Sequence, residues 1–183
     1  MFAVIVGCSE SGYHLAKSLL ATGHEVVVIE KDRERCQLLI DEVGGISLQG
    51  DGTDEVILKQ AGLARADVLI AVTGRDDTNL VVCQMTKHVF NVPRTMAVIR
   101  DPKNEALFHL LGVDVVVNSI HLVLASLEEG IPGRPLVHLS SLSAPGTELI
   151  SVSIPSDAGV VGMRLEDVEL PPPSFISLVI KKG

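Results

Sequence analysis

Six residues with the composition of a ligand-binding turn follow the first apolar segment of the chain (residues 2–6): Gly7, Cys8, Ser9, Glu10, Ser11 and Gly12. They match the glycine-rich turn at which parallel α/β folds bind phosphates, with its middle glycine replaced by Ser9. We expect Gly7 to allow a tight turn and Gly12 to let the following helix pack close to the strand. The N-terminus of that helix would offer free N–H groups and a partial positive charge to a phosphate. The alternative is a turn that serves packing alone.

An acidic residue stands where such a turn requires one. Glu30 ends the second apolar segment, 23 positions after Gly7, where a carboxylate binds the ribose hydroxyls of an adenosine. The alternative is that Glu30 is only surface charge. In the binding role it would repel a 2′-phosphate, since two like charges ~4 Å apart cost about 1–4 kcal/mol. The sequence therefore predicts NAD(H) in preference to NADP(H), although the positive charges of Lys31 and Arg33 weaken that preference.

Two residues within the turn narrow the ligand further. Glu10 adds negative charge close to the phosphates and so disfavours a triphosphate. We therefore expect ATP less than NAD(H), AMP or ADP. Ser9 carries a side chain where the backbone normally approaches a pyrophosphate, which leaves a mononucleotide open as the alternative to a dinucleotide.

Two later loops are candidates for the same site. Asp51 and Gly52 follow the third apolar segment, and in this fold that loop lies beside the adenine. The Asp51 carboxylate would accept a hydrogen bond from the adenine amino group. A helix-capping turn is an equal alternative. Thr73 and Gly74 follow the fourth apolar segment and would face the phosphates or the distal half of a dinucleotide.

Three charged residues near these loops have competing interpretations. For Asp76 and Asp77 we favour capping of the helix that follows. Arg100 ends the fifth apolar segment and would meet a phosphate there. An ion pair with Asp101 or Glu105 is an equally good account of Arg100.

The elements that position these residues repeat one pattern. Nearly continuous apolar runs alternate with amphipathic stretches, and the runs lie at residues 2–6, 25–29, 46–49, 68–72, 95–99 and 113–117. Such runs are typical of strands that are buried on both faces of a parallel sheet. Helix-capping residues and glycines bound the stretches between them. The sequence predicts an α/β fold with a doubly wound, Rossmann-like, six-stranded parallel sheet.

The pattern changes after a predicted helix at 119–129. We expect a nucleotide-binding domain at residues 1–130 and a linker at 131–146, which is rich in proline, glycine and serine. Residues 147–183 would form a partial α+β appendage, with strands at 147–154 and 175–180 and a short helix between them.

Composition excludes several classes of protein. The chain has 183 residues, is 46% hydrophobic and carries a formal charge of −8, so it builds a core and offers no basic face to nucleic acid. Three cysteines without a C-x-x-C pair suit a reducing compartment. No basic leader precedes the first strand and no apolar run approaches the ~20 residues of a membrane span. We therefore expect a soluble, cytoplasmic chain without direct membrane insertion.

No residue type points to catalysis or to a metal. The six histidines lack metal-binding spacing, so we assign no metal ligands. Cys8 is the one cysteine near the predicted site, and a small buried side chain is favoured over a redox role. Accordingly, we assign no catalytic residues.

Taken in order, these segments resemble the TrkA/KtrA-type RCK (KTN) family, with a TrkA-N domain and the start of a TrkA-C domain. The resemblance in the first domain is carried by Ile5–Gly12, Val28–Asp32, Gly50–Thr53, Ala71–Thr73, Asp76–Leu80, Ala97–Arg100 and Leu111–Asp114. That in the tail is carried by Val152–Ile154, Val161–Gly162, Leu165, Leu170–Pro171 and residues 175–180. The family usually has glycine at the position of Ser9 and often arginine at that of Val98, which Arg100 would replace from the same strand face.

The resemblance implies a cytoplasmic, nucleotide-binding regulatory subunit of a potassium uptake system, and not an enzyme. Such subunits form dimers, as homo- or hetero-oligomers, that assemble into a ring on a transmembrane potassium transporter or channel subunit. It also implies that the appendage is the beginning of a longer domain. Two alternatives remain: an NAD-dependent oxidoreductase, and the regulatory domain of a potassium–proton antiporter.

Overall fold

The computed structural model describes residues 1–129, 131, 136–141 and 148–180. The chain forms two compact units, Met1–Leu124 and Ala125–Gly183. The division falls inside a helix, a few residues before the domain boundary predicted at residue 130. No helix among the described residues is both long enough and apolar enough to cross a membrane.

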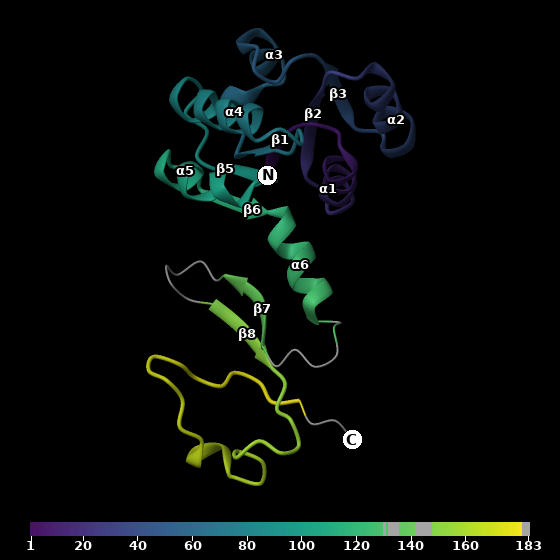
Figure 1. Cartoon of the computed structure of the whole chain (residues 1–183). Helices are drawn as coiled ribbons and strands as arrows, with labels where there is room; N and C mark the ends of the chain where they lie inside the picture. The colour runs from purple at the N-terminus through teal and green to yellow at the C-terminus, as the bar shows by residue number, and fades with distance from the viewer. Residues whose placement is uncertain (130, 132–135, 142–147, 181–183) are drawn as a thin grey trace. The chain divides into compact units, whose positions relative to one another are not determined.

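The first unit is built on a parallel sheet of six strands in the order β3-β2-β1-β4-β5-β6 (Figure 1). The strands are β1 (Phe2–Val6), β2 (Glu25–Glu30), β3 (Ile46–Gln49), β4 (Val68–Ala71), β5 (Thr95–Ile99) and β6 (Val115–Asn118). The predicted doubly wound, six-stranded parallel fold is confirmed. The largest difference is at β6, which begins two residues later than predicted because the Val113 N–H donates to the Phe108 carbonyl instead of to β5.

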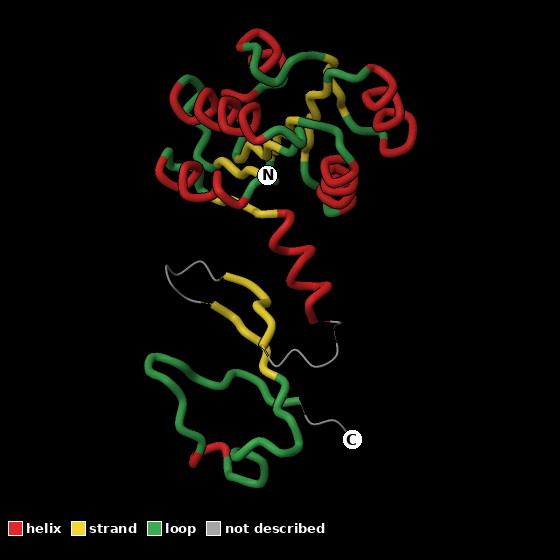
Figure 2. The backbone as a smooth tube through the Cα atoms, viewed as in Figure 1, coloured by secondary structure: helices red, strands yellow, loops and turns green. Residues whose placement is uncertain are grey.

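Among the described residues, six α-helices connect and follow the strands, and the first five lie around the sheet in Figure 2. They are α1 (Glu10–Ala21), α2 (Arg33–Val43), α3 (Glu55–Gln60), α4 (Asp76–His88), α5 (Glu105–Leu110) and α6 (Ser119–Glu129). The Asp32 and Asp54 side chains accept hydrogen bonds from the first turns of α2 and α3, as expected of helix caps. Gly44 ends α2 with φ 69°, a left-handed conformation that glycine adopts without steric cost.

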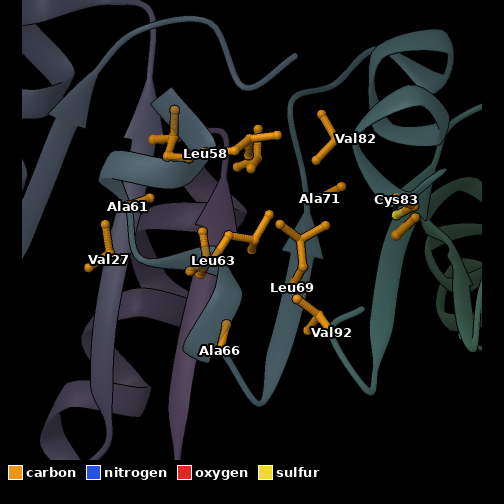
Figure 3. Packing of buried hydrophobic residues seen from close by; sticks show 14 of the residues in the cluster. Val27, Leu58, Ala61, Leu63, Ala66, Leu69, Ala71, Val82, Cys83 and Val92 are labelled. Carbon is orange, nitrogen blue, oxygen red and sulfur yellow. The ribbon is translucent and has the colours of Figure 1, made fainter. Parts of the chain in front are cut away.

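Apolar side chains cover both faces of the sheet, which explains the continuous apolar runs in the sequence. Along β1, Val4 and Val6 belong to one buried cluster and Ile5 to the other. The first cluster includes Leu58 of α3 together with Val82 of α4 and is shown in Figure 3. The second cluster contains buried residues of α1 and α2. Because side chains alternate along a strand, a strand covered on both faces needs no polar positions.

The second unit holds an antiparallel pair, β7 (Leu136–Ser141) and β8 (Glu148–Val152). The prediction of a strand at 147–154 agrees with β8, whereas β7 lies inside the stretch predicted as a linker. The strand predicted at 175–180 is wrong, and the predicted short helix is only a single 3₁₀ turn, Leu165–Asp167. Residues 175–180 have apolar side chains with high strand propensity, but a strand forms only beside a hydrogen-bonding partner. Within the described part of the chain, they have none.

The packing of α3 generates a stability prediction. Leu58 is fully buried, whereas Val56 on the same helix is 59% exposed. We expect Leu58→Ala to lower the free energy of unfolding by about 2–5 kcal/mol, because it removes buried carbon atoms and leaves a cavity. Val56→Ala, the matched control, should change it by less than about 0.5 kcal/mol. Urea unfolding followed by circular dichroism measures both, and equal values for the two variants would contradict the assigned core.

Candidate functional site

The carboxyl ends of the central strands bring the predicted site residues to one edge of the sheet. Hydrogen bonds continue beyond the strands at this edge: the Gly7 N–H donates to the Ile29 carbonyl at 2.8 Å, and the Gly50 N–H to the Glu30 carbonyl at 2.9 Å. On the other side of β1, the Val72 N–H donates to the Val6 carbonyl at 2.8 Å. The loops after β1, β2, β3 and β4 therefore begin side by side, at the point where the strand order reverses.

The two glycines of the first turn are both required by close backbone contacts. Gly7 has φ 105°, and a Cβ atom placed there would lie 2.7 Å from the Cα of Thr73. A Cβ atom on Gly12 would lie 2.2 Å from the carbonyl oxygen of Gly7, a separation that no real side chain tolerates. The first turn of α1 thus rests directly on the end of β1, as the spacing predicts.

The N-terminus of α1 faces this edge without a side-chain cap. Ser9 is the N-cap residue, but its hydroxyl donates to the Val72 carbonyl at 3.1 Å instead of accepting from the helix. Among the described residues, no acceptor is found for the N–H groups of Glu10 and Ser11. Glu10 is exposed in the first helical turn, where its carboxylate interacts favourably with the helix dipole but repels an anion that binds there. The geometry fits the predicted phosphate-binding turn.

Glu30 fastens the second loop to the first. One carboxylate oxygen accepts from the Cys8 N–H at 2.5 Å, and the other accepts from the Lys31 and Asp32 N–H groups at 2.7 and 3.0 Å. The carboxylate therefore has a fixed orientation at the end of β2. Cys8, predicted within the phosphate-binding turn, directs its N–H to Glu30, a contact that sequence spacing did not indicate.

Asp51 follows Gly50, whose N–H donates to the Glu30 carbonyl, and it is paired with Lys31. The Lys31 ammonium nitrogen is 2.8 Å from Oδ2 of Asp51, and Oδ1 accepts from the N–H and hydroxyl groups of Thr53 at 3.0 and 2.8 Å. Lys31 first, and then the Thr53 N–H, lower the pKa of Asp51 to about 2, so it is ionised at neutral pH. Asp51 therefore stabilises the turn before α3, whose cap is Asp54, and its contact with adenine stays a prediction.

Close packing accounts for two further residues of the predicted site, Gly52 and Cys8. A Cβ atom on Gly52 would lie 2.2 Å from a methyl carbon of Val6, so only glycine lets this loop pass over β1. The Cys8 thiol is buried, and burial raises its pKa, with the Glu30 carboxylate adding to the effect. All three cysteines are buried thiols, which accords with Cys8 as a small core side chain.

Asn79 holds the loop after β4, and sequence reasoning assigned it no role of its own. Its side chain is 1% exposed, and its Oδ1 accepts from the N–H and hydroxyl groups of Thr73 at 3.0 and 2.7 Å. Its Nδ2 donates to the Val98 carbonyl at 2.8 Å. The buried amide of Asn79 links the loop after β4 to β5 and holds the Thr73 backbone close to Gly7. A polar residue on the buried side of a predicted helix is the signal that would have found it.

The prediction for Asp76 needs correction. Asp76 is the first residue of α4 and does not cap that helix; its carboxylate accepts from the N–H groups of Arg100 and Asp101 and from Nδ2 of Asn104, at 2.8–3.0 Å. Burial opposes its ionised form, but these hydrogen bonds outweigh burial and lower the pKa of Asp76. It therefore clamps the loop after β5. Asp77 does not cap α4 either: the N-cap residue is Arg75, without a side-chain cap, and the Asp77 carboxylate pairs with the Arg75 guanidinium at 2.6 Å and accepts from the adjacent Thr78 N–H.

Arg100 lies exposed at the end of β5, with its guanidinium 3.5 Å from the Gly74 carbonyl. Neither Asp101 nor Glu105, both described in the structure, pairs with it; Asp101 accepts from Lys103 and Glu105 from Asn118. The ion-pair account is thus not supported, and the contact of Arg100 with a phosphate stays a prediction. Among the described residues, no cluster of histidine, cysteine or acidic side chains forms a metal site.

The parallel sheet, the left-handed glycine of the first turn and the carboxylate at the end of β2 define a doubly wound, Rossmann-like domain. The family model of the TrkA-N domain matches residues 3–119, and the chain belongs to this family. It is 31% identical to the Trk system potassium uptake protein TrkA homolog of Pyrococcus abyssi, over 98% of this chain and 81% of that protein. The homolog of Methanothermobacter thermautotrophicus is also 31% identical, over 98% and 82%.

Solved structures share the fold. The GsuK channel bound to NAD matches with a TM-score of 0.64 and 23% identity, over 76% of this chain and 25% of that one. The Shewanella denitrificans Kef CTD in its AMP-bound form matches with a TM-score of 0.64 and 17% identity, over 71% and 79%. The predicted resemblance to TrkA-type RCK domains is confirmed.

The contact between Gly12 and Gly7 generates a prediction about the turn. We expect Gly12→Val to abolish binding of NADH, because the new side chain would displace the Gly7 carbonyl and with it the N-terminus of α1. Lys17→Val places the same β-branched side chain at an exposed position of α1 and should leave binding unchanged within about twofold. Isothermal titration calorimetry measures both. Unchanged binding by Gly12→Val would mean that the turn serves packing alone.

Proposed function

We propose that this chain is a non-catalytic regulatory subunit of a potassium transport system, cytoplasmic and held at the membrane by a transmembrane partner. It would bind a nucleotide at the carboxyl edge of the sheet, NAD(H) before AMP or ADP, and ATP less well. The observation that carries the proposal is the TrkA-N match over residues 3–119, which contains every predicted nucleotide-binding residue. Similarity to Trk potassium uptake proteins over 98% of the chain favours an uptake system over an antiporter.

The geometry of the site supports an adenosine nucleotide. The N–H groups at the start of α1 suit a phosphate, and the fixed carboxylate of Glu30 suits ribose hydroxyls. Related folds in the NAD-bound GsuK channel and the AMP-bound Kef domain make both a dinucleotide and a mononucleotide reasonable ligands. The negative charges of Glu10 and Glu30 favour ligands with fewer phosphate charges.

The acidic side chains at the edge support binding without catalysis. Glu30, Asp51 and Asp76 each accept hydrogen bonds from protein donors, and the pKa values of Asp51 and Asp76 are lowered. A general acid or base works best with a pKa near neutrality and with access to the reacting group. These three carboxylates serve as fixed acceptors, which fits a sensor better than an oxidoreductase.

Signalling by such a sensor requires a second state. A nucleotide shifts an equilibrium between two assembled states only by its difference in affinity for them. Apolar side chains exposed on α5, on the residue after it and on α6 offer an assembly surface: Leu107, Leu110, Leu111, Ile120, Val123 and Leu124. We infer that a second copy covers this surface and that dimers assemble into a ring on the transmembrane partner.

The ligand assignment is tested by comparing two dinucleotides. We expect NADH to bind about five- to thirtyfold more tightly than NADPH, because Glu30 repels the 2′-phosphate. Glu30→Ala should weaken NADH binding and shrink that ratio. Glu25→Ala removes a carboxylate at the opposite end of β2 and should leave the ratio unchanged. Calorimetry gives all the constants, and equal affinities in the parent protein would refute the assignment of Glu30 to the ribose.

The assembly surface is tested by light scattering at micromolar concentration. We expect the parent chain to be at least a dimer and Val123→Glu to be smaller, because a buried unpaired carboxylate at an interface is costly. Val56→Glu is the matched control, since Val56 is 59% exposed and Val123 58%. A monomeric parent, or the same loss of assembly in both variants, would contradict the proposed surface.

A further inference from the structure

We propose that Asp51 sets the preference of the site for NAD(H) over NADP(H), by holding the Lys31 ammonium away from the ribose 2′ position. Asp51 is then a positioning residue that acts through Lys31. The inference rests on the proposed function, because it assumes that an adenosine ribose binds at Glu30.

Lys31 lies next to the carboxylate that would bind the ribose. Its N–H donates to the Glu30 carboxylate at 2.7 Å, so its backbone borders the group that would bind the ribose hydroxyls. A phosphate on the 2′ hydroxyl would lie within reach of the four-carbon Lys31 side chain, and in this fold a basic residue near the acidic one accommodates that phosphate. Left without a partner, Lys31 would therefore offset the repulsion by Glu30.

The structure gives Lys31 a different partner. Its ammonium nitrogen lies 2.8 Å from Oδ2 of Asp51, in the neighbouring loop. Asp51 is itself held in place, because its other oxygen accepts both the N–H and the hydroxyl of Thr53. The low pKa of Asp51, about 2, keeps the carboxylate charged at neutral pH. Lys31 is thus directed toward the loop after β3, and its charge is neutralised there.

The Lys31–Asp51 ion pair is too exposed to contribute much to stability, so we expect its loss to change ligand selectivity. The side chains are 65% and 44% exposed, and an ion pair this open contributes little to folding stability. Its effect should therefore appear in the selectivity for the 2′-phosphate. Releasing Lys31 makes the difference, because a cation close to a phosphate group with about two negative charges gains a strong, charge-assisted contact.

The experiment measures NADH and NADPH affinities by calorimetry in five proteins: the parent, Asp51→Asn, Lys31→Met, the double variant and Asp51→Glu. We expect Asp51→Asn to shift the ratio of NADH affinity to NADPH affinity about five- to tenfold toward NADPH. Circular dichroism shows whether each variant is folded. In the Lys31→Met background, Asp51→Asn should have no such effect. Asp51→Glu, which keeps the charge, should restore the preference of the parent.

A remote ion pair provides the matched control. Glu25 pairs with Arg65 at the amino end of β2, and their side chains are 49% and 61% exposed. Glu25→Gln removes one negative charge at about 17 Å from Glu30 along the strand, beyond the Debye length of about 8 Å. We expect it to leave the NADH-to-NADPH ratio unchanged.

Three results would overturn the inference. The first is an unchanged ratio of NADH to NADPH affinity in Asp51→Asn. The second is an equal change in the Lys31→Met background, which would assign the effect to the charge of Asp51 alone. The third is an equal shift in Glu25→Gln, which would assign the effect to net charge. A parent protein that binds neither dinucleotide would instead refute the proposed function, and the inference with it. These outcomes are distinguishable from one another in a single set of titrations.

Discussion

The close approach of the first turn of α1 to the end of β1 is the constraint on which the candidate site depends. The Cβ position of Gly12 lies 2.2 Å from the Gly7 carbonyl, and that of Gly7 lies 2.7 Å from the Thr73 backbone. Because Gly7 and Gly12 have no side chains, the backbones of the first turn, of α1 and of the loop after β4 can meet at the centre of the sheet edge. Ser9 can replace the middle glycine of the usual fingerprint because its side chain turns away from the helix and bonds to the Val72 carbonyl.

Polar side chains secure the loops around this contact, and each one joins two neighbours. Glu30 joins the loops after β1 and β2, Asn79 joins the loop after β4 to β5, and Asp76 joins the start of α4 to the loop after β5. Each acceptor meets N–H donors that have no partner within a strand or helix and so satisfies them. The carboxylates therefore have a structural role at this edge.

The sequence predicts the fold well because its rules are local. Continuous apolar runs indicate strands with two covered faces, and caps such as Asp32 bound the helices, so the succession of strands and helices and nearly all strand boundaries follow. The pairing of Lys31 with Asp51 and the clamp formed by Asp76 join loops 20 to 25 residues apart in the chain, and spacing alone does not reveal them. At residues 175–180 the local rule fails for the opposite reason: strand propensity is present, but the described chain supplies no neighbouring strand.

The same contacts lead from the site toward the assembly surface. Gly7 rests on Thr73, Thr73 bonds to Asn79, and Asn79 bonds to the Val98 carbonyl of β5. The next carbonyl of that strand, on Ile99, accepts from the hydroxyl of Ser119, the first residue of α6. Contiguity alone is not coupling, because a signal needs an element with two arrangements that the ligand distinguishes. The start of α6 is where these contacts reach the exposed apolar surface, so an element that couples the Thr73 loop to assembly would have to include it.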